Sequence, residues 1–517
     1  MERKNEIYTD VEAGQFTKEC LNLHKRLDSP VMAYFAEDLR KESGVFRVCC
    51  VFLDRKAGRW EIARTSIPGD DPKMPSLAGE MYSASLFERE MAEMFGICFE
   101  GSPDSRRLVL HDEVWPAGYY PLRKDFAPPA QGQKTGGERG ERSERSEYRF
   151  KRVEGEGIFE VPVGPVHAGI IGPGHFRFSV AGEPIINLET RLGFTHRGVE
   201  KMLEGMDARD AVSLAEKVAG DSAFAYSCAF CGGIERIYGI RVPGRAKILR
   251  ALFLELERMY NHANDIGGIA TDVGFSFPNA LASVIKEGLL ALNGNLTGSR
   301  YLKGVNRIGG VASDISAEGK VLLLKSLDTA QKDFSELREL LHSSISFMDR
   351  VDNTGILKKK TAADLGITGL AARASGIRSD LRSVFDGDIY DACGFKPVTE
   401  EDGDVLARLD VRLNEFDASV WLIKKLAAML GGLSEPPETE TKWEPKEGSS
   451  IGCVEAWRGP LLFWIRTGRD GRIERCKIVD PSFRNWQGLC FAVLGNIIPD
   501  FPLCNKSFDL SYPGNDL

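Results

Sequence analysis

Residues that could bind a metal or transfer protons gather in one part of this 517-residue chain. Two of its seven histidines, His167 and His175, lie in a run rich in Gly and Pro, and His196 follows soon after. Imidazole nitrogens bind metals and exchange protons near neutral pH. We therefore take residues 164–240 as the part of the chain around which a functional site would form.

Cysteine thiols are a second possible set of metal ligands, and the chain has eleven. Only Cys228 and Cys231 have C-x-x-C spacing, which on a helix places both thiols on one face. A metal site needs about four ligands, and no second C-x-x-C completes the set. We therefore interpret these two cysteines as small residues packed in a core helix, and expect the thiols to stay reduced.

Hydrophobic spacing predicts the elements that position these groups. Residues 176–180 and 185–189 alternate as the two strands of a hairpin, and helical spacing follows. Residues 245–260 and 322–342 are predicted to be long helices that pack as a bundle core. His262 comes just after the first of these helices, and we expect it to pack in the core or cap the helix.

Composition divides the chain into two predicted domains, residues 1–126 and 148–517. The segment between them, 127–147, is rich in Pro, Gly, Gln and charge and is predicted to be a flexible linker. Such a tether buries almost nothing, so we expect the domains to be separable compact units. A Gly/Pro loop at 431–438 should end the helical bundle, and strands should follow near 453–465.

The overall composition excludes some classes of function. A net charge of −8 argues against nonspecific nucleic-acid binding. No apolar run approaches the ~20 residues that span a bilayer, and the start of the chain has no secretory signal. We therefore expect a soluble, cytoplasmic protein, and these features leave open whether it docks on membrane proteins.

The chain resembles the large subunit of membrane-bound (group 4) nickel–iron hydrogenases and the related quinone-site subunit of respiratory complex I. The matching motifs are GPVH (164–167), HRGVEK (196–201), VAGDSAFAYS (218–227), NRIGG (306–310), GLAARASG (369–376) and EAWRG (455–459). The resemblance implies an α+β fold. A small α+β domain would precede a mainly helical-bundle domain with peripheral β-hairpins, as in nickel–iron hydrogenase large subunits.

The first 126 residues resemble the smaller, 30-kDa partner subunit of complex I, here fused ahead of the large, 49-kDa-like one. Strands are predicted at 45–53 and 60–64, and a helix at 83–97. The resemblance implies that this domain docks an iron–sulfur partner. A solvated charged surface is the alternative explanation of its many charges.

In the hydrogenases, four Cys thiolates from two C-x-x-C motifs hold nickel and bridge it to iron. The matching positions here are Ala219, Ser222, Ser511 and Gly514. Hydroxyl and methyl groups do not replace soft thiolates. The resemblance therefore implies that the nickel–iron site is absent, that this chain binds no cofactor of its own, and that hydrogenase activity is not expected.

The quinone-binding alternative has lost its residues too. In complex I a His and a Tyr hold the quinone headgroup, and the matching positions here are Ile171 and Gly220. A quinone-reducing subunit of an NAD-binding, NADH dehydrogenase-like complex would need a different clamp.

Charged residues survive at the matching site. Glu200 matches the proton-relay glutamate of the hydrogenases, and Arg458 matches the arginine above the metal cavity, with Trp457 in place of the usual proline. Asp221 lies between two lost ligand positions. We expect Glu200, Asp221 and Arg458 to line one cavity and relay protons there, with His167 as a fourth candidate; a satisfied ion-pair network remains the alternative. Other charged residues in or near the matching motifs are His196, Arg197, Arg373, Asp380, Arg382, Asp509 and Asp516.

The resemblance implies a large-subunit-like component of a membrane-associated, energy-converting oxidoreductase complex that couples electron transfer to ion translocation, without nickel. A quinone-reducing subunit and a purely structural scaffold remain alternatives, so whether the chain is itself an enzyme stays open. The expected partners are an iron–sulfur small subunit, which carries its own cluster, and antiporter-like and other membrane subunits. The expected place is the cytoplasmic face of the inner membrane, as a peripheral subunit.

Overall fold

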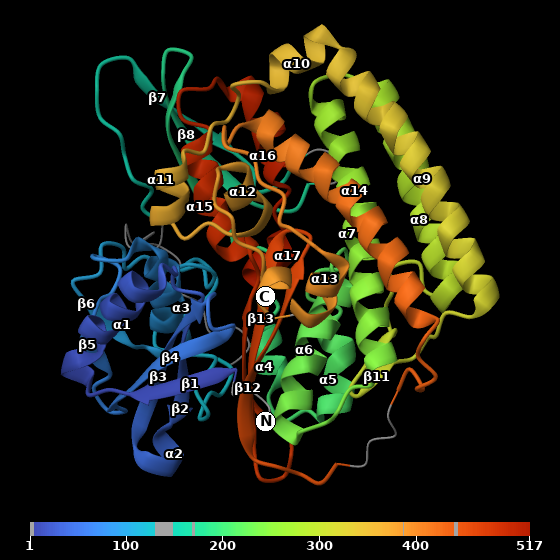
Figure 1. Ribbon diagram of the computed structural model, residues 1–517. Helices are drawn as coiled ribbons and strands as arrows, with labels where there is room; N and C mark the ends of the chain where they lie inside the picture. The colour runs from blue at the N-terminus through green and yellow to red at the C-terminus, as the bar shows by residue number, and fades with distance from the viewer. Residues whose placement is uncertain (1–4, 130–147, 168–170, 386, 439–442) are drawn as a thin grey trace.

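The computed structural model describes residues 5–129, 148–167, 171–385, 387–438 and 443–517. Figure 1 shows the N-terminal segment, in blue, beside a larger second segment whose long helices α7, α8, α9 and α14 stand together on the other side. From residue 130 on, the predicted linker lies outside the described residues.

The N-terminal segment is built on a four-stranded sheet of order β1-β4-β3-β2. Strand β1 pairs parallel to β4, and the other pairs are antiparallel. Its elements are β1 Glu6–Asp10, α1 Ala13–Leu27, β2 Ala33–Leu39, α2 Arg40–Ser43, β3 Val45–Asp54, β4 Arg59–Pro68, β5 Lys73–Pro75, α3 Ser85–Phe95 and β6 Cys98–Glu100. The predicted strands and helix are confirmed as β3, β4 and α3. Strand β2 escaped prediction because Glu37 and Asp38 interrupt its apolar run.

The second segment is mainly helical, with two three-stranded antiparallel sheets at its edges. The fold class predicted from the sequence is therefore confirmed. The elements before α9 are β7 Ile158–Val163, β8 His175–Ala181, β9 Ile185–Arg191, α4 Val199–Leu203, α5 Ala208–Ala215, α6 Ala223–Tyr238, α7 Gly244–Asp272, α8 Ser276–Thr297, β10 Asn306–Arg307 and β11 Gly310–Val311. The later elements are α9 Ala317–Ser343, α10 Ile345–Val351, α11 Lys359–Asp364, α12 Gly369–Ala374, the 3₁₀ turn η2 Leu381–Ser383, α13 Gly387–Cys393, α14 Val405–Leu430, β12 Gly448–Ala456, β13 Gly459–Thr467, β14 Ile473–Val479, α15 Ser482–Ala492, α16 Phe501–Phe508 and α17 Tyr512–Asp516.

Most predicted elements of this segment are found, with one boundary wrong. The hairpin is β8 and β9, and the bundle ends at Leu430 where the Gly/Pro loop begins. The helix predicted to end at residue 260 continues to Asp272, because the polar residues after Tyr260 find partners inside the protein. His262 therefore lies within α7, fully buried, rather than after a helix.

The two segments share a core. Strands β12 and β13 lie against the N-terminal sheet (Figure 1), and one apolar cluster combines residues of that sheet with Ile451, Leu462 and Trp464. Phe35 packs on Trp464 with ring centroids 4.6 Å apart. The boundaries at 126 and 148 remain a prediction. A shared core of this kind does not favour two units that separate freely.

Candidate functional site

Asp221 and Arg458 form the centre of the predicted site. Asp221 lies on the loop between α5 and α6, and Arg458 on the turn between β12 and β13. Arg458 Nη1 and Nη2 donate to Asp221 Oδ1 and Oδ2 at 3.0 and 2.7 Å, a bidentate ion pair. The Asp221 side chain is 40% exposed and that of Arg458 only 6%. The structure thus brings together two residues that lie far apart in the sequence.

Close backbone packing holds the turn that carries Arg458. Gly369 has φ 63°, and a Cβ there would collide with the Arg458 carbonyl oxygen. Gly459 faces it with φ 143°. Glycine is therefore needed at both positions, which explains part of the EAWRG and GLAARASG patterns.

Neighbouring side chains fix the loop that carries Asp221. Asn261 Nδ2 donates to the Asp221 carbonyl oxygen at 2.8 Å. The Arg197 guanidinium donates to the carbonyl oxygens of Lys217 and Val218 at 2.9 and 2.7 Å. The loop is therefore held from two sides by side chains of its own fold.

At the positions that match the hydrogenase ligands, no side chain offers a free atom that could bind a metal. Ser222 Oγ accepts from Trp457 Nε1 at 3.0 Å and donates to Asp221 Oδ1 at 3.1 Å. Ser511 Oγ caps α17 by accepting from the Gly514 amide at 2.9 Å. A Cβ on Gly514 would lie 2.7 Å from Asp480 Oδ2, and Ala219 contributes only a buried methyl group. These residues do not fit a nickel–iron group.

An Asp–Tyr pair lies beside the same positions and was not predicted to be a site. Tyr226, on α6, donates to Asp480 Oδ2 at 2.6 Å. Burial, and next the Asp480 carboxylate, raise the pKa of the phenol well above its usual value. Tyr226 is therefore a neutral hydrogen-bond donor here.

Glu200 lies in a different cluster from Asp221 and Arg458. Its carboxylate accepts from Arg475 Nη1 at 2.7 Å and from the Ile478 amide at 2.9 Å, and lies 3.2 Å from Lys477 Nζ. Burial raises the pKa of Glu200, but Lys477 and Arg475 outweigh it, so the pKa lies below its usual value. Lys477 also pairs with Glu90 of α3 at 2.6 Å.

The predicted trio is therefore split. A small cavity of about 30 Å³ borders Glu200, and its lining includes His196 and Asp516 but neither Asp221 nor Arg458. Among the described residues, no hydrogen bond or ion pair joins Glu200 to that pair. The sequence could not reveal this, because Arg475 and Lys477 lie on β14, which the pattern did not predict.

His167 lies apart from these clusters. Its Nε2 is 2.8 Å from the Gly174 carbonyl oxygen, and its ring packs against Phe176. The contacts described for His167 tie the loop before β8 to its own hairpin.

A buried polar seam runs between α7 and α14, and sequence analysis missed it. His262 Nε2 lies 2.8 Å from Glu415 Oε2, and Arg412 Nε donates to Asp265 Oδ2 at 2.9 Å. Farther along, Ser419 Oγ donates to Glu255 Oε2 at 2.6 Å. The signal was present: the seam residues follow helical spacing on each helix, at 255, 258, 262 and 265 on α7 and at 412, 415 and 419 on α14.

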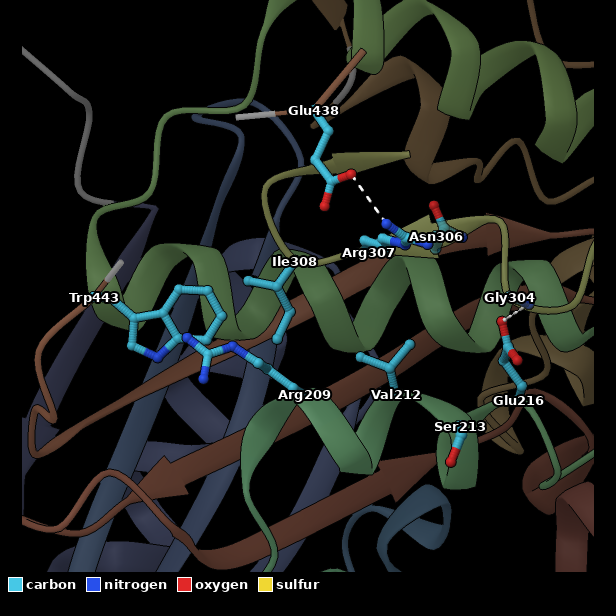
Figure 2. Close-up of a pocket in the computed structure, with 10 residues that line it drawn as sticks. All are labelled: Arg209, Val212, Ser213, Glu216, Gly304, Asn306, Arg307, Ile308, Glu438 and Trp443. Carbon is cyan, nitrogen blue, oxygen red and sulfur yellow. Dashed lines mark hydrogen bonds and ion pairs between the residues drawn. The ribbon is translucent and has the colours of Figure 1, made fainter. Parts of the chain in front are cut away.

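A cavity of about 620 Å³ lies beside α5, and Figure 2 shows the residues that line it. The Arg209 guanidinium lies 4.2 Å above the Trp443 ring, and Arg307 pairs with Glu438 at 3.3 Å. Glu216 accepts from the Gly304 amide at 2.8 Å. Among the described residues that line it there is no His, Tyr or Cys. At the matching clamp positions, Ile171 is 48% exposed and Gly220 has no side chain.

The interpretation of the C-x-x-C pair as packing residues is confirmed. Cys231 is fully buried in the main apolar cluster, and Cys228 packs against it. Across the described ranges, no group of three or more His, Cys, Asp or Glu residues is arranged to hold a metal. None of the helices in those ranges combines the length and apolar character needed to cross a membrane.

Two family models match the chain. The respiratory-chain NADH dehydrogenase 30 Kd subunit matches residues 10–132, and the respiratory-chain NADH dehydrogenase 49 Kd subunit matches residues 272–447. The chain thus carries both kinds of sequence in one polypeptide, as its two resemblances imply.

Curated relatives match almost the whole chain. Formate hydrogenlyase subunit 5 of Escherichia coli is 30% identical over 99% of this chain and 89% of that protein. Hydrogenase-4 component G of E. coli is 31% identical over 96% and 85%. The fused C/D protein of the NADH-quinone oxidoreductase of Bacteroides thetaiotaomicron is 29% identical over 77% of each. A chain from the membrane-bound sulfane sulfur reductase, an archaeal respiratory membrane complex, shares the fold with a TM-score of 0.65 at 24% identity, covering 70% of this chain and 99% of that one.

Proposed function

This chain belongs to the family of membrane-bound hydrogenase large subunits and fused C/D proteins of NADH-quinone oxidoreductases, and we propose that it is the equivalent subunit of a membrane-associated, complex I-like oxidoreductase complex. The complex couples electron transfer to ion translocation. The chain meets an iron–sulfur subunit, which carries the nearest redox centre, and antiporter-like membrane subunits. It lies at the cytoplasmic face of the membrane and works without nickel.

One observation carries the nickel-free part of the proposal. Arg458 and Asp221 form a bidentate pair beside Ser222, whose hydroxyl is already bonded to Trp457 and Asp221. The polar groups at this position therefore already bond to one another, and none of them is a thiolate that could hold nickel. Charge at the site is compensated between Arg458 and Asp221 without a metal ion.

Metal analysis tests this part of the proposal. The complex is purified after expression with its neighbouring subunits and hydrogenase maturation factors, and nickel is measured per chain. We expect no stoichiometric nickel, because all four thiolates are missing. Iron from the partner's cluster, measured in the same sample, serves as the positive control. About one nickel per chain would overturn the proposal.

The relay part of the proposal falls on Asp221 and Arg458 rather than on Glu200. Asp221 is partly exposed and bonded to the buried Arg458 guanidinium, so the pair connects solvent with the buried polar groups behind it. Glu200 is held ionised by two cations, so it supports the junction of the two segments instead.

Substitution at Asp221 tests the relay. In the reconstituted complex, Asp221→Asn keeps the size of the side chain but removes its negative charge and one of the two oxygens that accept from Arg458. We expect assembly to persist while ion transport falls about tenfold or more. Asp210→Asn, on the exposed face of α5, is the control and should change neither. Unchanged transport in Asp221→Asn leaves a structural scaffold as the better explanation.

A further inference from the structure

A cluster of charged side chains lies buried behind the turn that carries Trp457 and Arg458. We call it the Arg373 cluster. Its members come from α7, α12, η2, α14 and β12, and each side chain is at most 1% exposed. They are the carboxyl groups of Glu255, Asp380, Glu415 and Glu455 and the guanidinium groups of Arg258, Arg373 and Arg382.

Each guanidinium in the cluster contacts at least two carboxyl groups. Arg373 contacts Glu415 and Glu455, each at 2.7 Å. Arg382 contacts Asp380 at 2.7 Å and Glu255 at 3.0 Å. Arg258 lies 3.1 Å from Glu255 and 3.7 Å from Glu415.

The cluster thus has four acids and three permanent cations. An unmatched buried charge is costly, so one acid gains free energy by binding a proton.

Glu455 is the member that best holds this proton. It shares Arg373 with Glu415, whose other partners are Arg258 and His262. Burial, and next the Asp380 carboxylate, raise the pKa of Glu455 to about 7. By contrast, although burial alone would raise it, the guanidiniums lower the pKa of Glu255 to about 2. For Glu415 the same balance, led by Arg373, places the pKa well below its usual value.

His262 connects this cluster to the Arg458 site. Glu415 is an ionised acceptor, so His262 Nε2 carries the hydrogen of their 2.8 Å bond. Nδ1 then carries a buried lone pair, and it has no hydrogen-bond partner among the described residues. Burial lowers the pKa of His262 to about 4, which keeps the ring neutral. Asp265 lies three residues on, on the same side of α7.

From Asp265 a line of bonded groups leads to solvent. Asp265 pairs with Arg412 and Asp509 with Lys506, each at 2.9 Å, and the Asp509 carboxylate, after burial, raises the pKa of Asp265 well above its usual value. Arg458 Nη2 lies 3.7 Å from Asp509 and 2.7 Å from Asp221, whose side chain is 40% exposed. The Trp457 indole lies between His262 and Arg458. The His262 ring packs against it in a T-shaped arrangement, and the Arg458 guanidinium lies 3.8 Å from its centre.

We propose that the Arg373 cluster is a proton-loading site that holds one exchangeable proton on Glu455, and that His262 passes this proton between the cluster and the Asp265–Asp509 pair. When the free Nδ1 of His262 takes up a proton from the Asp265 side, the Nε2 proton leaves to Glu415. The imidazole stays neutral in its other tautomer, and rotation of the ring restores the first. Glu415 and Glu455 both contact Arg373, which stays a cation throughout, so a proton on either acid balances the charge of the cluster. This deepens the proposed relay at Asp221 and rests on it for its role in the complex.

The loading step is tested on the full chain alone, so its outcome does not depend on the proposed complex. Infrared difference spectra are recorded through a titration from about pH 5 to pH 9. We expect a protonated-carboxyl band that disappears with a midpoint at about pH 7 and is missing in Glu455→Gln. Two other buried acids, Glu93 and Glu257, have pKa values raised by burial to about 7 and about 8, so Glu93→Gln is the matched control and should remove a different band. Identical bands in the wild type and Glu455→Gln would overturn the loading site.

The transfer step is tested by the rate at which deuterium enters the Glu455 carboxyl group after dilution into heavy water. We expect His262→Gln to slow this exchange at least about tenfold, because the titratable ring that links the two acid groups is gone. His342→Gln, which changes an exposed histidine paired with Asp410 at 3.0 Å, is the control and should leave the rate unchanged. If His262→Gln does not fold, nitrogen NMR of the native imidazole decides: protonated Nδ1 with bare Nε2 contradicts the proposal. An unchanged exchange rate also contradicts it.

Discussion

Two buried ion clusters of this protein are built from the same residue types and differ in their charge balance. The first, the Glu200 cluster, joins the two segments with two acids, Glu90 and Glu200, and two cations, Arg475 and Lys477. The second, the Arg373 cluster, has four acids and three cations. The Arg373 cluster is fully buried, whereas in the Glu200 cluster the Glu90 side chain is 12% exposed.

The difference indicates which cluster can change its protonation state. In the Glu200 cluster every carboxylate has a matching cation, so proton binding would leave a buried positive charge unmatched. In the Arg373 cluster one proton completes the balance. A balanced cluster is suited to holding elements together, and an unbalanced one to storing a proton.

The largest effect should follow from unbalancing the first cluster. Glu200→Gln leaves Arg475 and Lys477 with only Glu90, so one cation is buried without a partner. We expect a loss of about 3–5 kcal/mol in the free energy of unfolding, measured with denaturant. Glu447→Gln, which removes a half-exposed partner of Arg469, should cost less than about 1 kcal/mol. A loss of that small size for Glu200→Gln would mean that the cluster does not hold the segments together.

A middle-sized effect on stability should come from His262, which connects the polar seam to the Arg373 cluster. The pKa of His262 is about 4 in the folded protein and about 6.5 when unfolded. Between these values the unfolded chain binds more protons, so stability should fall as pH falls from about 6.5 to about 4. The difference amounts to about 3 kcal/mol, and His262→Gln should lose this part of the pH dependence.

Unfolding of the wild type and His262→Gln, compared at each pH in that range, checks the expectation. Parallel curves for the two proteins would show that His262 is charged, or exposed, in the folded state. Other groups titrate in this range, so only the difference between the two curves reports on His262.

The smallest effect should come from Glu455→Gln, the same chemical change as Glu200→Gln in the unbalanced cluster. The variant leaves three acids and three cations, so at pH 6 its stability should lie within about 1 kcal/mol of the wild type. The pKa of Glu455 is raised, so the wild type should lose stability as pH rises from about 4.5 to about 7, and the variant should lack this loss. A cost as large as that of Glu200→Gln would remove the distinction between the clusters.

The sequence by itself determined much of the fold and one part of the site. Alternation and helical spacing predicted the hairpin β8–β9, the helices α7 and α9 and the end of α14. Positions 219, 222, 511 and 514 carry Ala, Ser, Ser and Gly, so no thiolate is present there, and no fold can turn a methyl or hydroxyl group into a soft ligand. The matching motifs placed Asp221 and Arg458 at one site, and the structure showed that they form an ion pair.

Only the tertiary structure decided which buried carboxyl groups are paired with a matching number of cations. Spacing on α7 places Glu255 and His262 on one face, but their partners come from α14 and η2, more than a hundred residues away. Glu200 resembled a relay group until β14 supplied Arg475 and Lys477 beside it. The pKa of a buried group depends on every charge within a few ångströms, and a sequence pattern fixes the face of an element but not what packs against it.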